Sequence, residues 1–181
     1  MRRQVVLLFG RPGVGKFTVG SDLAEETGFR LLHNHAVVDL VEALFPFGSP
    51  PFVAMREKLW LDAVEMALSA GLPGLILTFA PERTVNEAFL PMLAFRVQEC
   101  GGALRLIELR CEPKEIEHRL GDPSREAFGK LRDVALYREL EARGAFDLPM
   151  PAAELAIDTD ILSPGEAAKF IAAHLRGPSP C

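Results

Sequence analysis

Long hydrophobic runs are missing from this chain of 181 residues, and none approaches the roughly 20 apolar residues of a membrane-spanning helix. Residues 5–9 follow Arg2 and Arg3 but are too few for the apolar core of a signal peptide. Blocks of like charge are also missing. The net charge of −5 does not suggest the basic patch typical of proteins that bind duplex nucleic acid. We therefore expect a cytoplasmic protein that binds neither membranes nor nucleic acid.

Cysteine is scarce, and the three residues, Cys100, Cys111 and Cys181, show no spacing typical of metal ligands. An odd number of thiols without such spacing favours reduced cysteines in a reducing compartment. The rest of the composition, 49% hydrophobic and 25% charged, is ordinary for a globular protein. The length fits one compact domain, which we expect to span residues 1–176, followed by a flexible tail at 177–181.

Short apolar segments alternate along the chain with segments of helical periodicity. The apolar segments predict strands at residues 4–9, 29–32, 74–79, 103–109 and 155–157. Helical spacing and capping signals predict helices at about 15–27, 37–44, 49–70, 82–100, 113–120, 131–140 and 163–176. Pro91 is expected to bend or split the fourth of these helices. Such alternation is typical of an α/β fold with a parallel sheet covered on both faces.

The strongest motif lies between the first predicted strand and the first predicted helix. It consists of Gly10, Arg11, Pro12, Gly13, Val14, Gly15, Lys16, Phe17 and Thr18. The glycines allow a tight turn whose N–H groups point inward at phosphate oxygens, and the helix N-terminus adds partial positive charge. Lys16 supplies a mobile cation for the β- and γ-phosphates. The motif predicts a binding site for a nucleoside triphosphate.

Phe17 stands where phosphate-binding loops usually carry the Ser or Thr that binds Mg²⁺, and the hydroxyl follows one residue later, at Thr18. In this respect the motif resembles the loop of the nucleoside-monophosphate kinases, which ends Gly-Lys-Gly-Thr. In that family the threonine contacts phosphate, and the metal keeps mostly water ligands. The resemblance implies that Thr18 has this role toward phosphate and Mg²⁺.

The whole strand–helix plan is similar to that of the small P-loop kinases, which include nucleotide kinases, shikimate kinase, gluconate kinase and chloramphenicol phosphotransferase. The resemblance is specific in residues at 10–18, at about 119–130 and at 157–160. It implies a five-stranded parallel sheet in the order 2-3-1-4-5, with a nucleotide (ATP or GTP), Mg²⁺ and a small-molecule acceptor. A monomer or a small homo-oligomer is expected.

Residues 33–70 form the expected acceptor side of the site. The second predicted strand runs into His33, Asn34 and His35, and Asp39 follows one helical turn beyond His35. Shikimate-type kinases carry a carboxylate just after this strand to orient the acceptor hydroxyl. The resemblance therefore points to Asn34 or Asp39, and of the two only the Asp39 carboxylate can serve as a base. Alternatively, the two histidines belong to a loop and bond only to backbone.

Arg56 lies on the helix that covers the acceptor in related kinases, where a bidentate arginine would hold an anionic acceptor. The alternative is a solvated arginine beside Glu57. Aromatic side chains surround this segment and predict either core residues or the wall of an apolar acceptor pocket. They are Phe45, Phe47, Phe52 and Trp60.

The third predicted strand ends without the aspartate that many P-loop enzymes use there for the water shell of the metal. Thr78 occupies this region and can hold a water molecule, and Glu82 is the nearest carboxylate. Because nucleotide kinases usually keep the aspartate, its absence favours the shikimate or antibiotic kinase branches.

Two later segments complete the expected site. In P-loop kinases the arginines that follow the fourth strand close over the phosphates. Arg125 is therefore the predicted catalytic arginine of a lid at about 119–130, with Arg119 near the base or phosphates. The alternative is a charged surface loop. Asp158 and Thr159 resemble the Ile-Asp-Thr segment whose following backbone cups adenine, or else they form an Asx-type turn.

These residues together predict an ATP-dependent phosphotransferase. It would move the γ-phosphate to a hydroxyl or phosphate of a small molecule, with Lys16 and Arg125 stabilising the transition state. The alternative is a nucleotide-binding switch or slow ATPase with a vestigial acceptor site. The missing strand-three aspartate favours that alternative, and the arginine-bearing lid opposes it.

Overall fold

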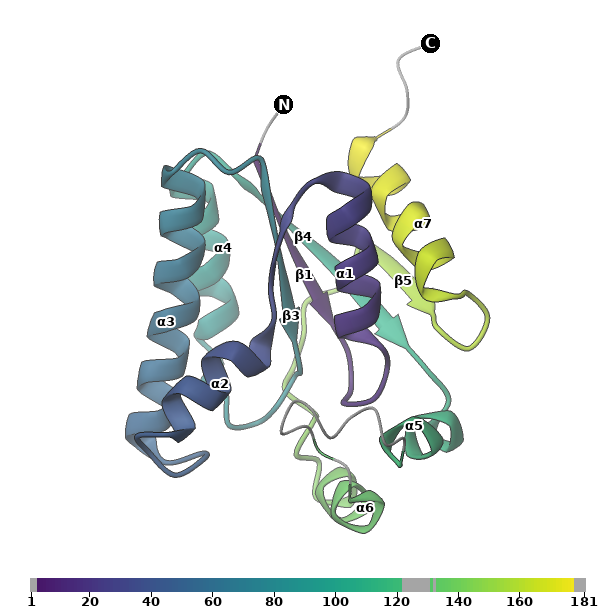
Figure 1. Ribbon diagram of the computed structural model, residues 1–181. Helices are drawn as coiled ribbons and strands as arrows, with labels where there is room; N and C mark the ends of the chain where they lie inside the picture. The colour runs from purple at the N-terminus through teal and green to yellow at the C-terminus, as the bar shows by residue number, and fades with distance from the viewer. Residues whose placement is uncertain (1–2, 122–130, 132, 178–181) are drawn as a thin grey trace.

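A computed structural model describes residues 3–121, 131 and 133–177 (Figure 1). Its sheet has five strands in the order β2-β3-β1-β4-β5, and all strand pairs are parallel. The strands are β1 (Gln4–Phe9), β2 (Arg30–Leu32), β3 (Gly74–Phe79), β4 (Ala103–Arg110) and β5 (Leu155–Asp158). The predicted α/β class and strand order are confirmed.

Helices cover both faces of the sheet. They are α1 (Lys16–Thr27), α2 (Asn34–Glu42), α3 (Pro50–Ser69), α4 (Phe89–Glu99), α5 (Pro113–Leu120), α6 (Val134–Ala142) and α7 (Pro164–Arg176). Figure 1 shows α1 and α7 on one face and α3 and α4 on the other, with α2, α5 and α6 near the carboxyl ends of the strands. Within the described part of the chain, no helix is long and apolar enough to cross a bilayer.

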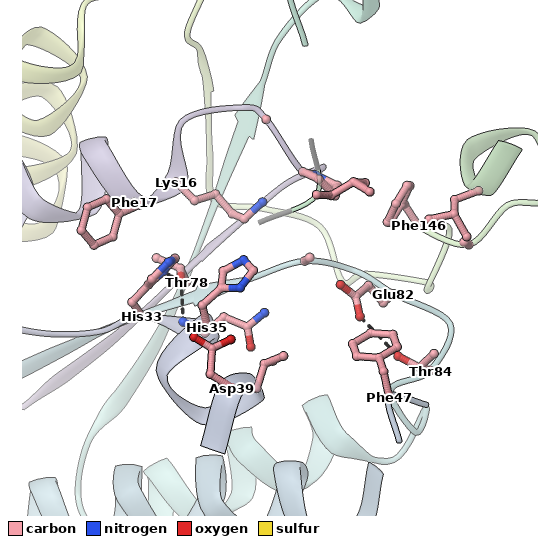
Figure 2. A pocket seen from close by; sticks show the side chains of 18 of the residues that line it. Lys16, Phe17, His33, His35, Asp39, Phe47, Thr78, Glu82, Thr84 and Phe146 are labelled. Atoms are coloured by element: carbon pink, nitrogen blue, oxygen red, sulfur yellow. Dashed lines mark hydrogen bonds between the residues drawn. The ribbon is translucent and has the colours of Figure 1, made fainter. Parts of the chain in front are cut away.

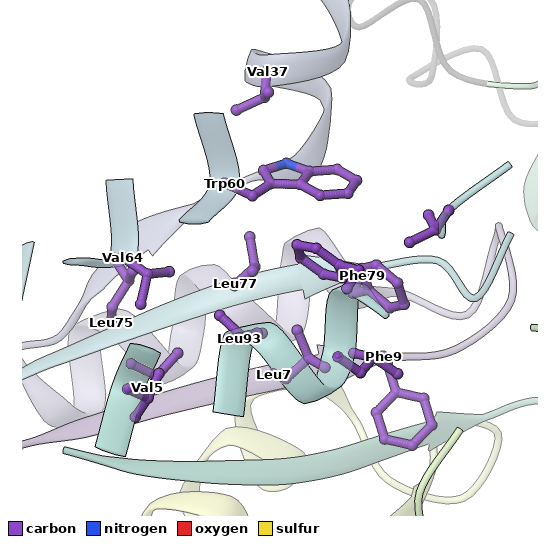
Figure 3. Close-up of a cluster of buried hydrophobic side chains, with 14 of the residues drawn as sticks. Val5, Leu7, Phe9, Val37, Trp60, Val64, Leu75, Leu77, Phe79 and Leu93 are labelled. Carbon is purple, nitrogen blue, oxygen red and sulfur yellow. The ribbon is translucent and has the colours of Figure 1, made fainter. Parts of the chain in front are cut away.

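Alternate residues of the central strands feed two separate cores. Val5 and Leu7 of β1 pack with α3 and α4, whereas Val6 and Leu8 pack with α1 and α7. All four are fully buried, which explains why β1 is apolar at nearly every position. Figure 3 shows the first of these cores.

Trp60 of α3 lies in the first core, against two phenylalanines that stack on each other. Its ring centroid is 5.9 Å from that of Phe79 and 5.2 Å from that of Phe89. Phe52 of the same helix is also fully buried. Of the four aromatic residues around the expected acceptor segment, these two therefore belong to the core.

The predicted helix over 82–100 is wrong in its first half. α4 begins only at Phe89, and residues 80–88 form a loop tied down by the bond from Arg83 N to Ala145 O. Pro91 falls in the first turn of α4, where its missing N–H costs no intrahelical hydrogen bond, so the helix is not split. The second predicted helix also starts earlier than expected, at Asn34. Residues 178–181 of the expected tail lie outside the described residues.

Candidate active site

The glycine-rich loop between β1 and α1 has a backbone that only glycine accommodates. Gly13 has a φ of 91°, and a Cβ there would lie 2.9 Å from Cγ2 of Ile116. Gly10 has a φ of 154°, and its Cβ would lie 2.4 Å from the carbonyl oxygen of Leu109. The loop leads into α1, whose first N–H groups have no intrahelical partners. These donors lie at the mouth of a cavity and can bind phosphate oxygens.

Lys16 folds back over this loop. Its Nζ donates to the carbonyl oxygens of Gly10 at 2.6 Å and Arg11 at 2.7 Å. Figure 2 shows its ammonium group on the cavity side of the loop. The positive charge therefore lies at the centre of the cradle, where the sequence predicted the phosphates.

Two cavities meet at the loop. The larger, of about 590 Å³, extends from the loop to α2, to the segment after β3 and to α6. The smaller, of about 380 Å³, lies between the start of α1, Arg119 and the turn after β5. Gly15 and Thr18 line both cavities. The start of α1 is thus their shared wall, and the larger space is of the size that small-molecule sites have.

The end of β2 and the end of β3 are joined beside the loop. Nδ1 of His33 lies 2.9 Å from Oγ1 of Thr78, and the backbone N–H of Asn34 donates to the same oxygen at 3.0 Å. The His33 ring also lies 4.7 Å from that of Phe17 and 5.1 Å from that of His35. The predicted histidine cluster therefore lines the larger cavity together with the loop.

Helix α2 contributes a polar wall to this cavity. His35, Asp39 and Glu42 line it at intervals of about one helical turn. Opposite them Figure 2 shows Phe47 and Glu82. The predicted catalytic Asp39 therefore lies in the same cavity as Lys16.

Arg56 is not among the residues that line the described part of this cavity. Its side chain is 1% exposed. Arg56 is therefore not a solvated arginine, and it does not reach the cavity in which an anionic acceptor was expected. The guanidinium lies 5.1 Å from the Phe52 ring and 4.9 Å from the Trp60 ring. It donates to Thr84 O at 3.1 Å and lies 3.6 Å from Oε2 of Glu82. Arg56 thus holds the loop after β3 in place from the buried side, away from the cavity.

Glu82 is one of the cavity residues that the sequence did not place in the site, although it was noted as the nearest carboxylate; Glu42 is another. Oγ1 of Thr84 donates to Glu82 at 3.3 Å. Burial raises the pKa of the Glu82 carboxyl, and the charges of Arg56 and Lys16 oppose that rise. Its position depends on a contact between α3 and the loop after β3, for which the sequence has no local signal.

The side chain of Arg11 turns away from the cradle. It pairs with Glu141 at 2.9 Å and with Asp147 at 3.1 Å. Because Glu141 belongs to α6, this arginine joins the loop to that helix. The Arg11 backbone carbonyl nevertheless accepts the hydrogen bond from Lys16.

The smaller cavity has Arg119 and Thr159 in its lining. Arg119 donates to Thr159 Oγ1 at 3.0 Å and to Thr159 O at 2.9 Å. The Thr159 hydroxyl also lies 3.1 Å from the carbonyl oxygen of Val14 in the glycine-rich loop. Asp158 accepts a bond from the backbone N–H of Asp160 at 2.9 Å, which is the Asx-type turn of the alternative interpretation. The predicted catalytic Arg125 lies outside the described residues.

No protein-family model and no curated protein matches the chain. The APS kinase CysC of Mycobacterium tuberculosis, solved with AMPPNP and APS, matches with a TM-score of 0.66 at 18% identity, over 97% of this chain and 99% of that one. Shikimate kinase from Acinetobacter baumannii, in complex with shikimate, gives 0.58 at 17% identity, over 99% and 97%. The tunicamycin resistance protein of Deinococcus radiodurans gives 0.61 at 22% identity, over 96% of each chain.

At these identities the matches establish the fold. They extend over nearly the whole chain. The chain therefore has the fold of the P-loop small-molecule kinases.

Proposed function

We propose that the protein is a phosphotransferase that moves the γ-phosphate of ATP or GTP to a small-molecule acceptor. The observation that carries this proposal is the shared cavity. Lys16 of the phosphate-binding loop, His35, Asp39 and Glu82 line the same space of about 590 Å³. A protein that only binds and hydrolyses a nucleotide does not need a cavity with polar side chains beyond the position of the γ-phosphate.

The proposed transfer is a displacement at phosphorus. An oxygen of the acceptor forms a bond to the γ-phosphorus while the bond from that phosphorus to the β–γ bridging oxygen breaks. Where the acceptor group is a hydroxyl, its proton passes to a carboxylate, for which Asp39 is our candidate. Lys16 and the N–H groups of α1 stabilise the charge on the phosphate oxygens, because this chemistry depends mainly on positioning and electrostatics.

The nucleotide base fits the smaller cavity in this proposal, beside Arg119 and Thr159. Thr18 lines both cavities and is exposed, which supports a contact of its hydroxyl with phosphate. The described residues contain no group of three or more His, Cys, Asp or Glu side chains placed to hold a metal ion. A Mg²⁺ ion that enters with the triphosphate would therefore keep phosphate and water ligands, and it would neutralise phosphate charge.

ADP formation from MgATP, measured across a panel of acceptors, tests this proposal. The panel contains nucleoside monophosphates, shikimate, gluconate, amino sugars and chloramphenicol-like amides. Turnover should depend on an acceptor and be lost in Lys16→Ala, while Lys58→Ala, on the exposed face of α3, should behave as wild type. Slow hydrolysis that no acceptor accelerates would instead support a switch or ATPase, an outcome favoured by the absence of a strand-three aspartate.

A further inference from the structure

The acceptor half of the larger cavity is acidic. Asp39 and Glu42 line it from α2, and Glu82 lines it from the loop after β3. Lys16 is the only lysine or arginine in the part of its lining that the structure describes, and it belongs to the phosphate cradle. An acceptor that carries a carboxylate or phosphate would meet repulsion from this lining.

Arg56 does not neutralise the acidic lining of the cavity. Its guanidinium is held between Phe52 and Trp60, and it is engaged with Thr84 and Glu82. Moving it into the cavity would break these contacts and would leave Glu82 without its buried cation. The arrangement therefore presents a carboxylate to the ligand and keeps the arginine behind it.

The carboxylates on the α2 wall can accept hydrogen bonds from a ligand, because no described residue donates to them. Asp39 and Glu42 are exposed, and within the described residues neither side chain makes a hydrogen bond or an ion pair. Beside them, Oδ1 of Asn34 is buried and accepts no bond from the described residues.

Apolar side chains line much of the rest of the cavity, beside the hydroxyls of Thr78 and Thr84. They include Val38, Phe47, Leu136, Leu140, Ala145 and Phe146. Phe47 and Leu136 are 49% and 43% exposed, so they offer apolar surface to a ligand in this cavity. A sugar-like polyol would leave this surface wet, whereas an aromatic or aliphatic body would cover it.

From these observations we infer, on the basis of the proposed function, that the acceptor is an amphiphilic amino alcohol. Its apolar body packs between Phe47 and α6, and its protonated amine faces Asp39 and Glu42. Its hydroxyl lies toward Lys16 and is the group that receives the phosphate. The phosphate-accepting group is accordingly a hydroxyl and not a phosphate.

Three probes that share one apolar body test this inference by calorimetry, in the presence of Mg²⁺ and a non-hydrolysable ATP analogue. They are a phenyl-substituted amino alcohol, its N-acetyl amide and its N-succinyl amide, with charges of about +1, 0 and −1. We expect the amine to bind at least about tenfold more tightly than the succinyl anion, with the acetyl amide between them. Higher salt should narrow this difference.

The double variant Asp39→Asn with Glu42→Gln should lose most of the charge preference. A matched control is Glu25→Gln with Glu99→Gln, because both glutamates are exposed and line neither cavity. Equal or tighter binding of the anion, a preference that persists in the double variant, or no binding of any probe would overturn the inference.

The two proposals fail separately. Phosphoryl transfer to an anionic acceptor with rejection of the amine would keep the phosphotransferase and overturn the amino-alcohol class. Amine binding with the expected charge order, but without transfer to any acceptor, would keep the ligand class and overturn the phosphotransferase.

Discussion

The hydroxyl of Thr78 lies 2.9 Å from Nδ1 of His33 and fastens the start of α2 to the end of β3. The same oxygen accepts the backbone N–H of Asn34 at 3.0 Å. Thr78 is fully buried, so this contact is protected from solvent. Many P-loop enzymes carry an aspartate in this region for the water shell of the metal. Here the region instead holds one wall of the larger cavity in place.

Thr78→Val should remove this anchor while it keeps the shape of the side chain. The Asn34 N–H would lose its partner, so we expect the free energy of unfolding to fall by about 1–3 kcal/mol. The KM for the acceptor should rise more than the KM for the nucleotide. Ser21→Ala is the control, since the hydroxyl that it removes only donates to Phe17 O within α1. Unchanged stability and acceptor KM would show that the anchor is dispensable.

Glu82 should make acceptor-dependent turnover fall at low pH. Because burial raises the pKa of its carboxyl, the carboxylate form is lost at a higher pH than for an exposed glutamate. Activity should therefore fall as the pH drops through that raised pKa, and kcat/KM for the acceptor measured from about pH 5 to 8 would reveal it. In Glu82→Gln, kcat/KM for the acceptor should be lower than in the wild type and should no longer fall over this acidic limb of the pH profile. A limb that survives the substitution would have to come from another group.

Arg56→Met tests whether the buried arginine positions Glu82. Methionine can occupy the space between the two rings, but the Glu82 carboxylate would lose its cation, so we expect a loss of about 2 kcal/mol or more in the free energy of unfolding. The double variant Arg56→Met with Glu82→Gln should recover part of this loss, and a double-mutant cycle measures the coupling. Additive losses in stability, without a change in acceptor KM, would argue against this positioning role.

Cys111 should be a poorly reactive thiol. Burial and the hydrogen bond that it donates to Asp160, at 3.1 Å, raise the pKa of its thiol to about 12. Because the thiolate is the nucleophile, alkylation by iodoacetamide at about pH 8 should be at least about a hundredfold slower in the folded protein than in denaturant. Peptide mapping by mass spectrometry gives both rates. Similar rates in the two states would contradict a half-buried thiol that is hydrogen-bonded to Asp160.

The fold could be predicted because its signals are local. Each central strand is an apolar run bounded by glycine or by a helix start, and the alternation with helices leaves few topologies. The tight glycine-rich loop could be predicted for the same reason: its steric demands fall within nine consecutive residues, from Gly10 to Thr18. At Gly13 the structure shows the close approach that excludes a side chain.

The acceptor half could be predicted only in outline, because its geometry depends on contacts between distant segments. Arg56 and Thr84 are 28 residues apart and meet only once α3 packs beside the loop after β3. The resemblance to related kinases therefore suggested Arg56 as an anion-binding residue, and no local pattern marked Glu82 as the group that Arg56 supports. The late start of α4 has a similar cause, because the bond from Arg83 to Ala145 holds the preceding loop.

The bridge from Thr159 to Val14 has a consequence for the thermodynamics of nucleotide binding. Arg119 holds Thr159, whose hydroxyl lies 3.1 Å from the Val14 carbonyl, while Lys16 bonds two carbonyls in the same loop. The loop is thus braced before any anion arrives, so little conformational entropy remains to be lost on binding. In the proposed binding mode, Lys16 would exchange these two carbonyl partners for charged phosphate oxygens. The affinity for a triphosphate should therefore be mainly enthalpic and should depend on the charge of the terminal phosphate.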